Sequence, residues 1–106
     1  MNSLVVLTNC PDQAVADQLA HVLVESRLAA CVNILSPCRS VYRWQGEVET
    51  AVEFPLLIKS TAANYAALEN LIRQHHPYDV PEIIALPVER GLPEYLNWLS
   101  AETLPD

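Results

Sequence analysis

Glycine is scarce in this sequence. Gly46 and Gly91 are the only two glycines among 106 residues. Phosphate-binding loops such as the P-loop and the Rossmann fingerprint need several glycines at fixed spacing. Neither motif can be written with these two residues, so the common nucleotide-binding loops are excluded.

Basic residues are also few. The chain has 6 lysines and arginines against 13 acidic residues, which gives a formal net charge of -7. The basic positions are scattered and form no basic run. Proteins bind nucleic acid through a clustered basic face that neutralises phosphates. We therefore expect no nucleic-acid partner.

The N-terminal region lacks a long apolar run. Its apolar run covers only residues 4–7, and no basic stretch precedes it. This is too short for a signal peptide or a membrane span, so we expect a cytoplasmic protein with no membrane partner. In that compartment Cys10, Cys31 and Cys38 are expected to be reduced thiols. Without a CxxC pair, they predict neither a disulfide framework nor a zinc knuckle.

The apolar residues that are present follow helix and strand periods in turn. The expected elements are strands at 4–8, 30–44, 47–59 and within 81–89, and helices beginning near residue 11 and at 60–76 and 92–102. This order, β-α-β-β-α-β followed by a helix, is that of an α+β, ferredoxin-like domain. A parallel flavodoxin-like sheet would need a crossover helix where only the turn at Gln45–Gly46 is available.

Local signals suggest where the first two helices begin. Pro11 suits the first position of the first helix, and Asp12 complements the positive end of the helix dipole. Ser60 or Thr61 can cap the second helix.

The strands at 30–44 and 47–59 form an unusually long hairpin. Arms of roughly 12 residues reach about 40 Å, whereas a chain of this length folds into a globule only a little over ~30 Å across. The hairpin is therefore expected to overhang the domain, and its apolar side chains need a cover. We predict a homo-oligomer assembled through it. Pro37 and Pro55 cannot donate to a ladder, so each is expected at a bulge, bend or edge.

Cys10 is a candidate nucleophile. It precedes a helix start, where the helix dipole favours a thiolate. The alternative is a small residue at a strand–helix junction. An enzyme that uses Cys10 with a histidine is the least favoured of the functions considered.

His75 and His76 are adjacent and precede Pro77. Neighbouring residues on a helix diverge by roughly 100°, so such a pair chelates one ion only where the backbone is irregular. Pro77 makes the backbone irregular here, because it disfavours helical geometry at His76. Imidazole ligands favour copper or zinc over magnesium or calcium. The alternative is a helix end stabilised by cationic histidine.

Five segments in the same order and spacing resemble the CutA divalent-cation tolerance proteins. They are LAHVLVESRLAACVNI, SVYRWQGEVE, LLIKST, HHPYDVPEIIALPV and YLNWL, and the resemblance covers about residues 4–99. It implies that residues 1–106 form a single CutA-like domain and a homotrimer. It also implies a non-enzymatic protein of divalent-cation tolerance, with copper or another divalent cation bound at His75 and His76. The family's cysteine at this site corresponds to Thr8, and Cys10 lies two residues beyond it.

The implied trimer is similar to that of PII-type signalling proteins. This similarity favours an alternative function, a regulatory trimer that binds a small molecule or partner protein in the cleft between subunits. The candidate cleft residues are Tyr42, Trp44, Lys59 and Glu82. Alternatively, the two aromatic rings only pack at the subunit interface.

Overall fold

The structure, a computed structural model, describes residues 2–105. In chain order, its elements are β1 (Ser3–Cys10), α1 (Gln13–Glu25), β2 (Cys31–Ile34), β3 (Cys38–Trp44), β4 (Glu47–Thr61), a 3-10 turn (Ala62–Asn64), α2 (Tyr65–His75), β5 (Ile83–Pro87) and α3 (Pro93–Glu102). Strands β2 and β3 are two parts of one hairpin arm, because both pair with β4. The predicted order β-α-β-β-α-β followed by a helix is therefore confirmed.

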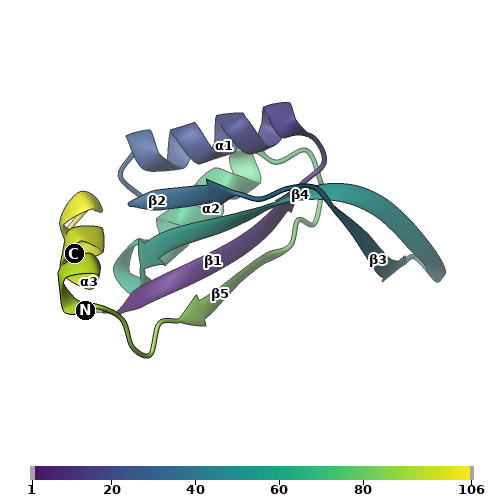
Figure 1. The fold of residues 1–106 in the computed structure, drawn as a ribbon. Helices are drawn as coiled ribbons and strands as arrows, with labels where there is room; N and C mark the ends of the chain where they lie inside the picture. The colour runs from purple at the N-terminus through teal and green to yellow at the C-terminus, as the bar shows by residue number, and fades with distance from the viewer. Residues whose placement is uncertain (1, 106) are drawn as a thin grey trace.

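The strands form one antiparallel sheet in the order β2-β4-β1-β5, and β3 continues beside the outer part of β4. Helices α1 and α2 lie on one face of the sheet, and α3 lies at its end (Figure 1). The core lies between the two helices and the sheet. Its fully buried side chains include Val6, Leu19, Leu23, Leu56, Ile58, Leu68 and Ile72. No described helix covers the opposite face of the sheet (Figure 1).

The predicted start of the first helix was wrong by two residues. Helix α1 begins at Gln13, and Asp12 is its N-cap: the Asp12 carboxylate accepts a hydrogen bond from the Val15 N–H at 2.8 Å. This cap satisfies a free N–H of the first turn, so it decides the boundary. Pro11 lies before the cap rather than at the first helical position.

Neither Ser60 nor Thr61 caps the second helix, so this prediction was also wrong. Both residues belong to the end of β4, and a 3-10 turn separates them from α2. The Ser60 hydroxyl instead donates to the Leu28 carbonyl, while the Thr61 hydroxyl accepts from the Asn64 side chain. Continued pairing with β1, as in Leu4 opposite Ser60, keeps these residues extended.

The hairpin carries a β-bulge where the two prolines occur. Ile34 pairs with Leu56 and Cys38 pairs with Glu53, so three residues of one arm face two of the other. Such an extra residue bends a strand pair. Pro37 lies in the bulge and Pro55 stands opposite it, so the prediction for both prolines is confirmed. Beyond this point β3 and β4 curve away from the sheet (Figure 1).

The hairpin overhangs the rest of the chain, as predicted. Its turn is at Gln45 and Gly46, which have positive φ angles of 50° and 82°; this geometry matches the twist of antiparallel strands. The molecule measures 44 × 25 × 23 Å, and the hairpin tip projects at one end of it (Figure 1). None of the helices described over residues 2–105 is long and apolar enough to cross a membrane.

Candidate functional site

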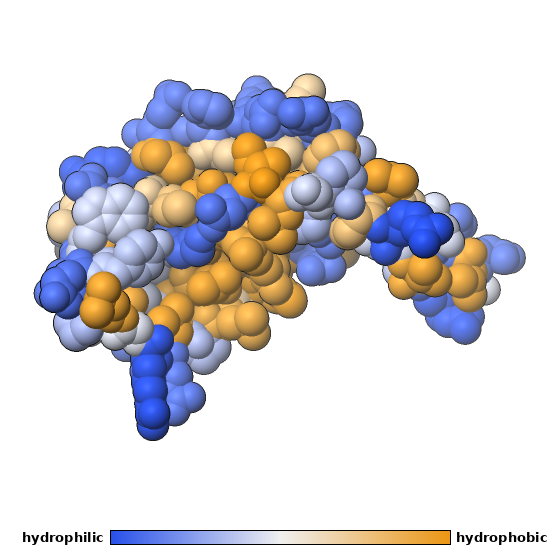
Figure 2. Space-filling view, viewed as in Figure 1, coloured by the Kyte–Doolittle hydropathy of each residue, from blue (hydrophilic) through white to orange (hydrophobic). Residues whose placement is uncertain are grey.

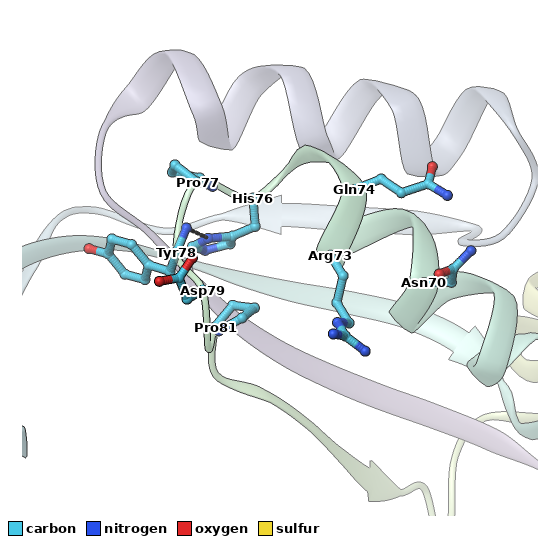
Figure 3. Close-up of a pocket in the computed structure, with 8 residues that line it drawn as sticks. All are labelled: Asn70, Arg73, Gln74, His76, Pro77, Tyr78, Asp79 and Pro81. Atoms are coloured by element: carbon cyan, nitrogen blue, oxygen red, sulfur yellow. Dashed lines mark hydrogen bonds between the residues drawn. The ribbon is translucent and has the colours of Figure 1, made fainter.

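The turn that follows α2 is built around His76. Helix α2 ends at His75, and His76 adopts an extended backbone with φ -89° and ψ 133°. Pro77 accounts for this conformation, because a residue before proline avoids the helical region. The chain then leads through Tyr78 to Pro81 and into β5 (Figure 3).

Both ring nitrogens of His76 are hydrogen-bonded. Nε2 lies 2.6 Å from the carbonyl oxygen of Asn9, and Nδ1 lies 3.1 Å from the backbone nitrogen of Tyr78. Because the Tyr78 N–H donates to Nδ1 (Figure 3), Nε2 carries the proton and donates to Asn9. The ring is buried and packs on the Tyr78 ring at a centroid distance of 4.8 Å. His76 thus joins the turn to the end of β1.

His75 has a different environment. It is the last residue of α2, its side chain is partly exposed, and no hydrogen bond to its ring occurs within residues 2–105. Over the same residues, no three His, Cys, Asp or Glu side chains are placed together so as to hold a metal ion. The described chain therefore offers at this turn one accessible imidazole and one that is engaged in the fold.

Thr8 occupies the position where the resemblance implies a cysteine. It is buried in β1, and its Oγ1 is a buried side-chain oxygen with no hydrogen-bond partner in the described chain. Cys10 follows two residues later and is also fully buried. Since alternate residues of a strand share a face, both side chains point into the helix-covered core.

The unpartnered hydroxyl leads to a stability prediction. Thr8→Val keeps the shape and removes a buried, unsatisfied polar group, so it should raise the free energy of unfolding by about 1 kcal/mol. Ser60→Ala is the matched control, because that buried hydroxyl donates to Leu28 O at 2.6 Å and its loss should destabilise. Urea denaturation of the two variants measures both changes. A less stable Thr8→Val protein would contradict the prediction.

The predicted activation of Cys10 was wrong. The pKa of its thiol is raised from 9.0 to about 11, chiefly by burial and in smaller part by the negative charges of Asp12 and Glu53. Because Cys10 lies inside β1 and not at the first turn of α1, these effects exceed any stabilisation of the thiolate by the helix dipole. The thiol stays protonated at neutral pH and does not provide a nucleophile.

This raised pKa predicts a loss of stability at alkaline pH. Between pH 9 and 11 the unfolded chain releases the Cys10 proton while the folded chain keeps it, so stability falls as pH rises through this range. The Tyr65 and Tyr78 hydroxyls also have raised pKa values and extend the fall to higher pH. Urea denaturation at pH 8 to 11 should give a shallower decline for Cys10→Ala than for the unchanged chain. Parallel declines would refute the assignment to Cys10.

A groove of about 790 Å³ lies between the projecting part of the hairpin and the turn after α2. The structure brings Tyr42, Trp44 and Glu82 together in its lining. The Asn9 amide donates to a Glu82 carboxylate oxygen at 3.3 Å, which links the end of β1 to the turn.

Lys59 does not line this groove. Its Nζ donates to Asn33 Oδ1 and lies 3.9 Å from the sulfur of Cys31. Cross-strand pairing places these three side chains on the open face of the sheet. Lys59 therefore lies apart from the other three residues predicted for the cleft.

The groove also contains residues that were not predicted from the sequence. Asn9, Glu53, Tyr78 and Asp79 line it together with the predicted residues. Strand alternation could have indicated one of them. It places Glu53 on the same side of β4 as Glu47 and Glu49, so these acidic residues share one face of the strand. Nothing local in the sequence indicates that the turn after α2 would close against the hairpin.

A smaller hollow of about 480 Å³ adjoins the same turn on its other side. Arg73 and Gln74 of α2 and His76, Asp79 and Pro81 of the turn contribute to its walls (Figure 3). Pro77, Tyr78 and Asp79 of the turn line both concave surfaces, whereas His76 lines only the smaller one.

These features define the class of protein: a small α+β protein with a ferredoxin-like antiparallel sheet, one open sheet face and a projecting hairpin. The chain belongs to the CutA1 divalent ion tolerance protein family, whose model matches residues 4–102. This membership places it among divalent-cation tolerance proteins, which are not enzymes.

Three relatives illustrate the match. The divalent-cation tolerance protein CutA of Thermus thermophilus is 50% identical over 99 residues, which cover 93% of this chain and 96% of the relative. The crystal structure of CutA1 from Oryza sativa superposes with a TM-score of 0.97 at 40% identity, covering 100% of this chain and 97% of that one. The structure of CutA from Archaeoglobus fulgidus, described as periplasmic, gives a TM-score of 0.91 at 35% identity and covers 96% and 98%.

Proposed function

We propose that the chain, residues 1–106 acting as a single unit, serves divalent-cation tolerance as a homotrimer. The open face of the sheet carries this proposal. Cross-strand pairs align Leu7 with Ile84 and Val5 with Leu86 on that face. Ile84 and Leu86 are 48% and 52% exposed. Apolar side chains cover the side of the sheet turned away from α1 (Figure 2), and such patches mark interaction sites.

The hairpin supplies a second surface for self-association. Val41, Val48 and Val52 are 69%, 65% and 57% exposed and share one face of the β3–β4 pair. A projecting strand pair with exposed valines is stabilised when another copy covers it. The resemblance to CutA and PII-type trimers supports three copies.

Complementation tests the tolerance function. The chain should restore growth on copper to a bacterial strain that lacks its own relative of this family. A variant unable to assemble, described in the Discussion, should not restore it. Growth that is rescued equally by both proteins would contradict a role for the trimer.

The second part of the proposal concerns the ion itself. We propose that copper, or another divalent cation, contacts the pair His75 and His76. His75 supplies the accessible imidazole. His76 can bind the ion only when Nδ1 loses its hydrogen bond from the Tyr78 N–H or Nε2 loses its hydrogen bond to the Asn9 carbonyl. Imidazole nitrogen suits copper and zinc. Any third ligand must come from another residue than a cysteine at position 8, because this chain has Thr8 there.

Calorimetric titration with Cu(II) tests this contact. His75→Ala should weaken binding by about tenfold or more, equivalent to ~1.4 kcal/mol. His21→Ala is the matched control, because His21 is an exposed histidine of α1 whose Nδ1 lies 2.8 Å from Asp17 O. Equal affinity in the unchanged chain and in His75→Ala would remove the metal role from the pair.

The groove favours a second candidate function. We propose that the trimer is regulatory and binds a small molecule against Tyr42, Trp44 and Glu82 in the groove beside the hairpin. Pockets of roughly 300–1,000 Å³ commonly hold such ligands, and this groove falls within that range. Lys59, on the open face, would approach the ligand only from the interface between subunits.

We also propose a cytoplasmic location. Support comes from the free thiols Cys10, Cys31 and Cys38, which suit a reducing compartment. Cell fractionation in the source organism tests it, and recovery in a periplasmic or secreted fraction would contradict it.

A further inference from the structure

The groove beside the hairpin has an unusual chemical composition. Three aromatic rings line it, Tyr42, Trp44 and Tyr78, together with three acidic residues, Glu53, Asp79 and Glu82. None of the lining side chains is basic. Aromatic faces and carboxylates both attract cations, so every strongly interacting group in the groove favours the same charge.

Glu53 is the central residue of this groove. Its side chain is only 8% exposed, yet within residues 2–105 no hydrogen bond or ion pair involves its carboxylate. Glu53 and Tyr78 line the groove together, and the negative charge of Glu53 contributes to the raised pKa of both Cys10 and Tyr78. Its carboxylate oxygens are not sealed from solvent, since the one side-chain oxygen within residues 2–105 that is both sealed and unpartnered is Thr8 Oγ1. A cation bound in the groove would therefore reach this carboxylate and give it a partner.

The neighbouring strand residues strengthen this negative field. On the hairpin, Tyr42 pairs directly with Glu49 and Trp44 pairs directly with Glu47. Directly paired residues share a face of the sheet. Each aromatic ring of the hairpin therefore lies beside an acidic side chain.

The geometry does not suit a bare metal ion. The carboxylates lie on both walls of the groove, with Glu53 on β4 and Asp79 and Glu82 on the turn after α2. Within the described residues, no three such side chains converge on one point. Rings spread along one wall instead suit a larger cation with an apolar body.

We propose that this groove binds a small organic ammonium ion, whose charge faces Glu53 and whose apolar body lies against Tyr42 and Trp44. This inference rests on the regulatory-cleft function proposed above and specifies the ligand class. The competing occupant is a basic side chain of a second copy, such as the exposed Arg39 or Arg43 of its hairpin.

Tryptophan fluorescence of the assembled protein tests the proposal. The chain has two tryptophans, so Trp98→Phe leaves Trp44 as the only one. Benzyltrimethylammonium is the probe, and benzyl alcohol is the neutral control. The ammonium ion should change the Trp44 emission saturably, and benzyl alcohol should not. Binding should weaken as sodium chloride rises, because charge attraction is screened.

Matched variants locate the charge. Glu53→Gln in the same background should weaken binding by about tenfold or more, equivalent to ~1.4 kcal/mol. Glu25→Gln removes the same charge from the end of α1 and should change the affinity less than twofold. If Glu53→Gln fails to fold, the salt dependence and the benzyl alcohol comparison on the Trp98→Phe protein still decide the question.

The outcomes separate this inference from the function on which it rests. No saturable binding by a protein that sediments as a trimer overturns the ammonium site and points to occupation by a partner's arginine. Equal binding of benzyl alcohol, or no effect of Glu53→Gln in a folded protein, also overturns it. If the chain sediments as a monomer, the trimeric cleft function fails, whatever the probe does.

Discussion

A chain carrying Ile84→Glu and Leu86→Glu is expected to sediment as a monomer, while the unchanged chain sediments as a trimer. Both side chains lie on the open face of the sheet and are about half exposed in the single chain. Burying an apolar side chain of this size contributes roughly 1.5–3 kcal/mol. Losing two such contacts per chain should weaken assembly by at least ~1,000-fold, which corresponds to ~4 kcal/mol.

The control for this prediction is Val24→Glu. Val24 lies on α1 and is 41% exposed, so it receives the same change away from the open face. It should leave the assembly intact. A double variant that stays trimeric, or a control that dissociates equally, would show that the open face is not the interface.

The second large effect is expected at His76. His76→Ala should lower the free energy of unfolding by about 3 kcal/mol, because the Asn9 carbonyl and the Tyr78 N–H lose their partner and a cavity replaces the ring. His75→Ala should change stability by less than ~0.5 kcal/mol, since its ring makes no hydrogen bond within residues 2–105.

Urea denaturation at one fixed protein concentration measures both changes, because the stability of an oligomer depends on concentration. His76→Gln should recover part of the loss, since a glutamine amide can still donate to Asn9. Equal effects of the two alanine variants would contradict the structural role of His76. The histidine pair therefore divides into a structural residue and an accessible one.

Features set by neighbouring residues could be predicted from the sequence. The hairpin turn followed from Gln45 and Gly46, and its overhang followed from strand lengths and the size of the chain. The end of α2 followed from Pro77, which constrains the residue before it. Each of these depends on interactions within a few positions along the chain.

Features that depend on distant residues could not be predicted. His76 is held by Asn9, which lies 67 positions away, and no local pattern indicates that contact. The groove that contains Glu53 depends on the turn after α2 lying opposite the hairpin. The start of α1 was wrong for a different reason: Asp12 was interpreted only as a charge that complements the helix dipole, whereas its side chain caps the helix and decides the boundary.

Sedimentation equilibrium of the unchanged chain at micromolar concentration tests the central claim most directly. A homotrimer of the 11.8 kDa chain predicts a molar mass of about 35 kDa. A stable mass near 11.8 kDa at that concentration would contradict the account, because the open face and the projecting hairpin would then remain exposed to water.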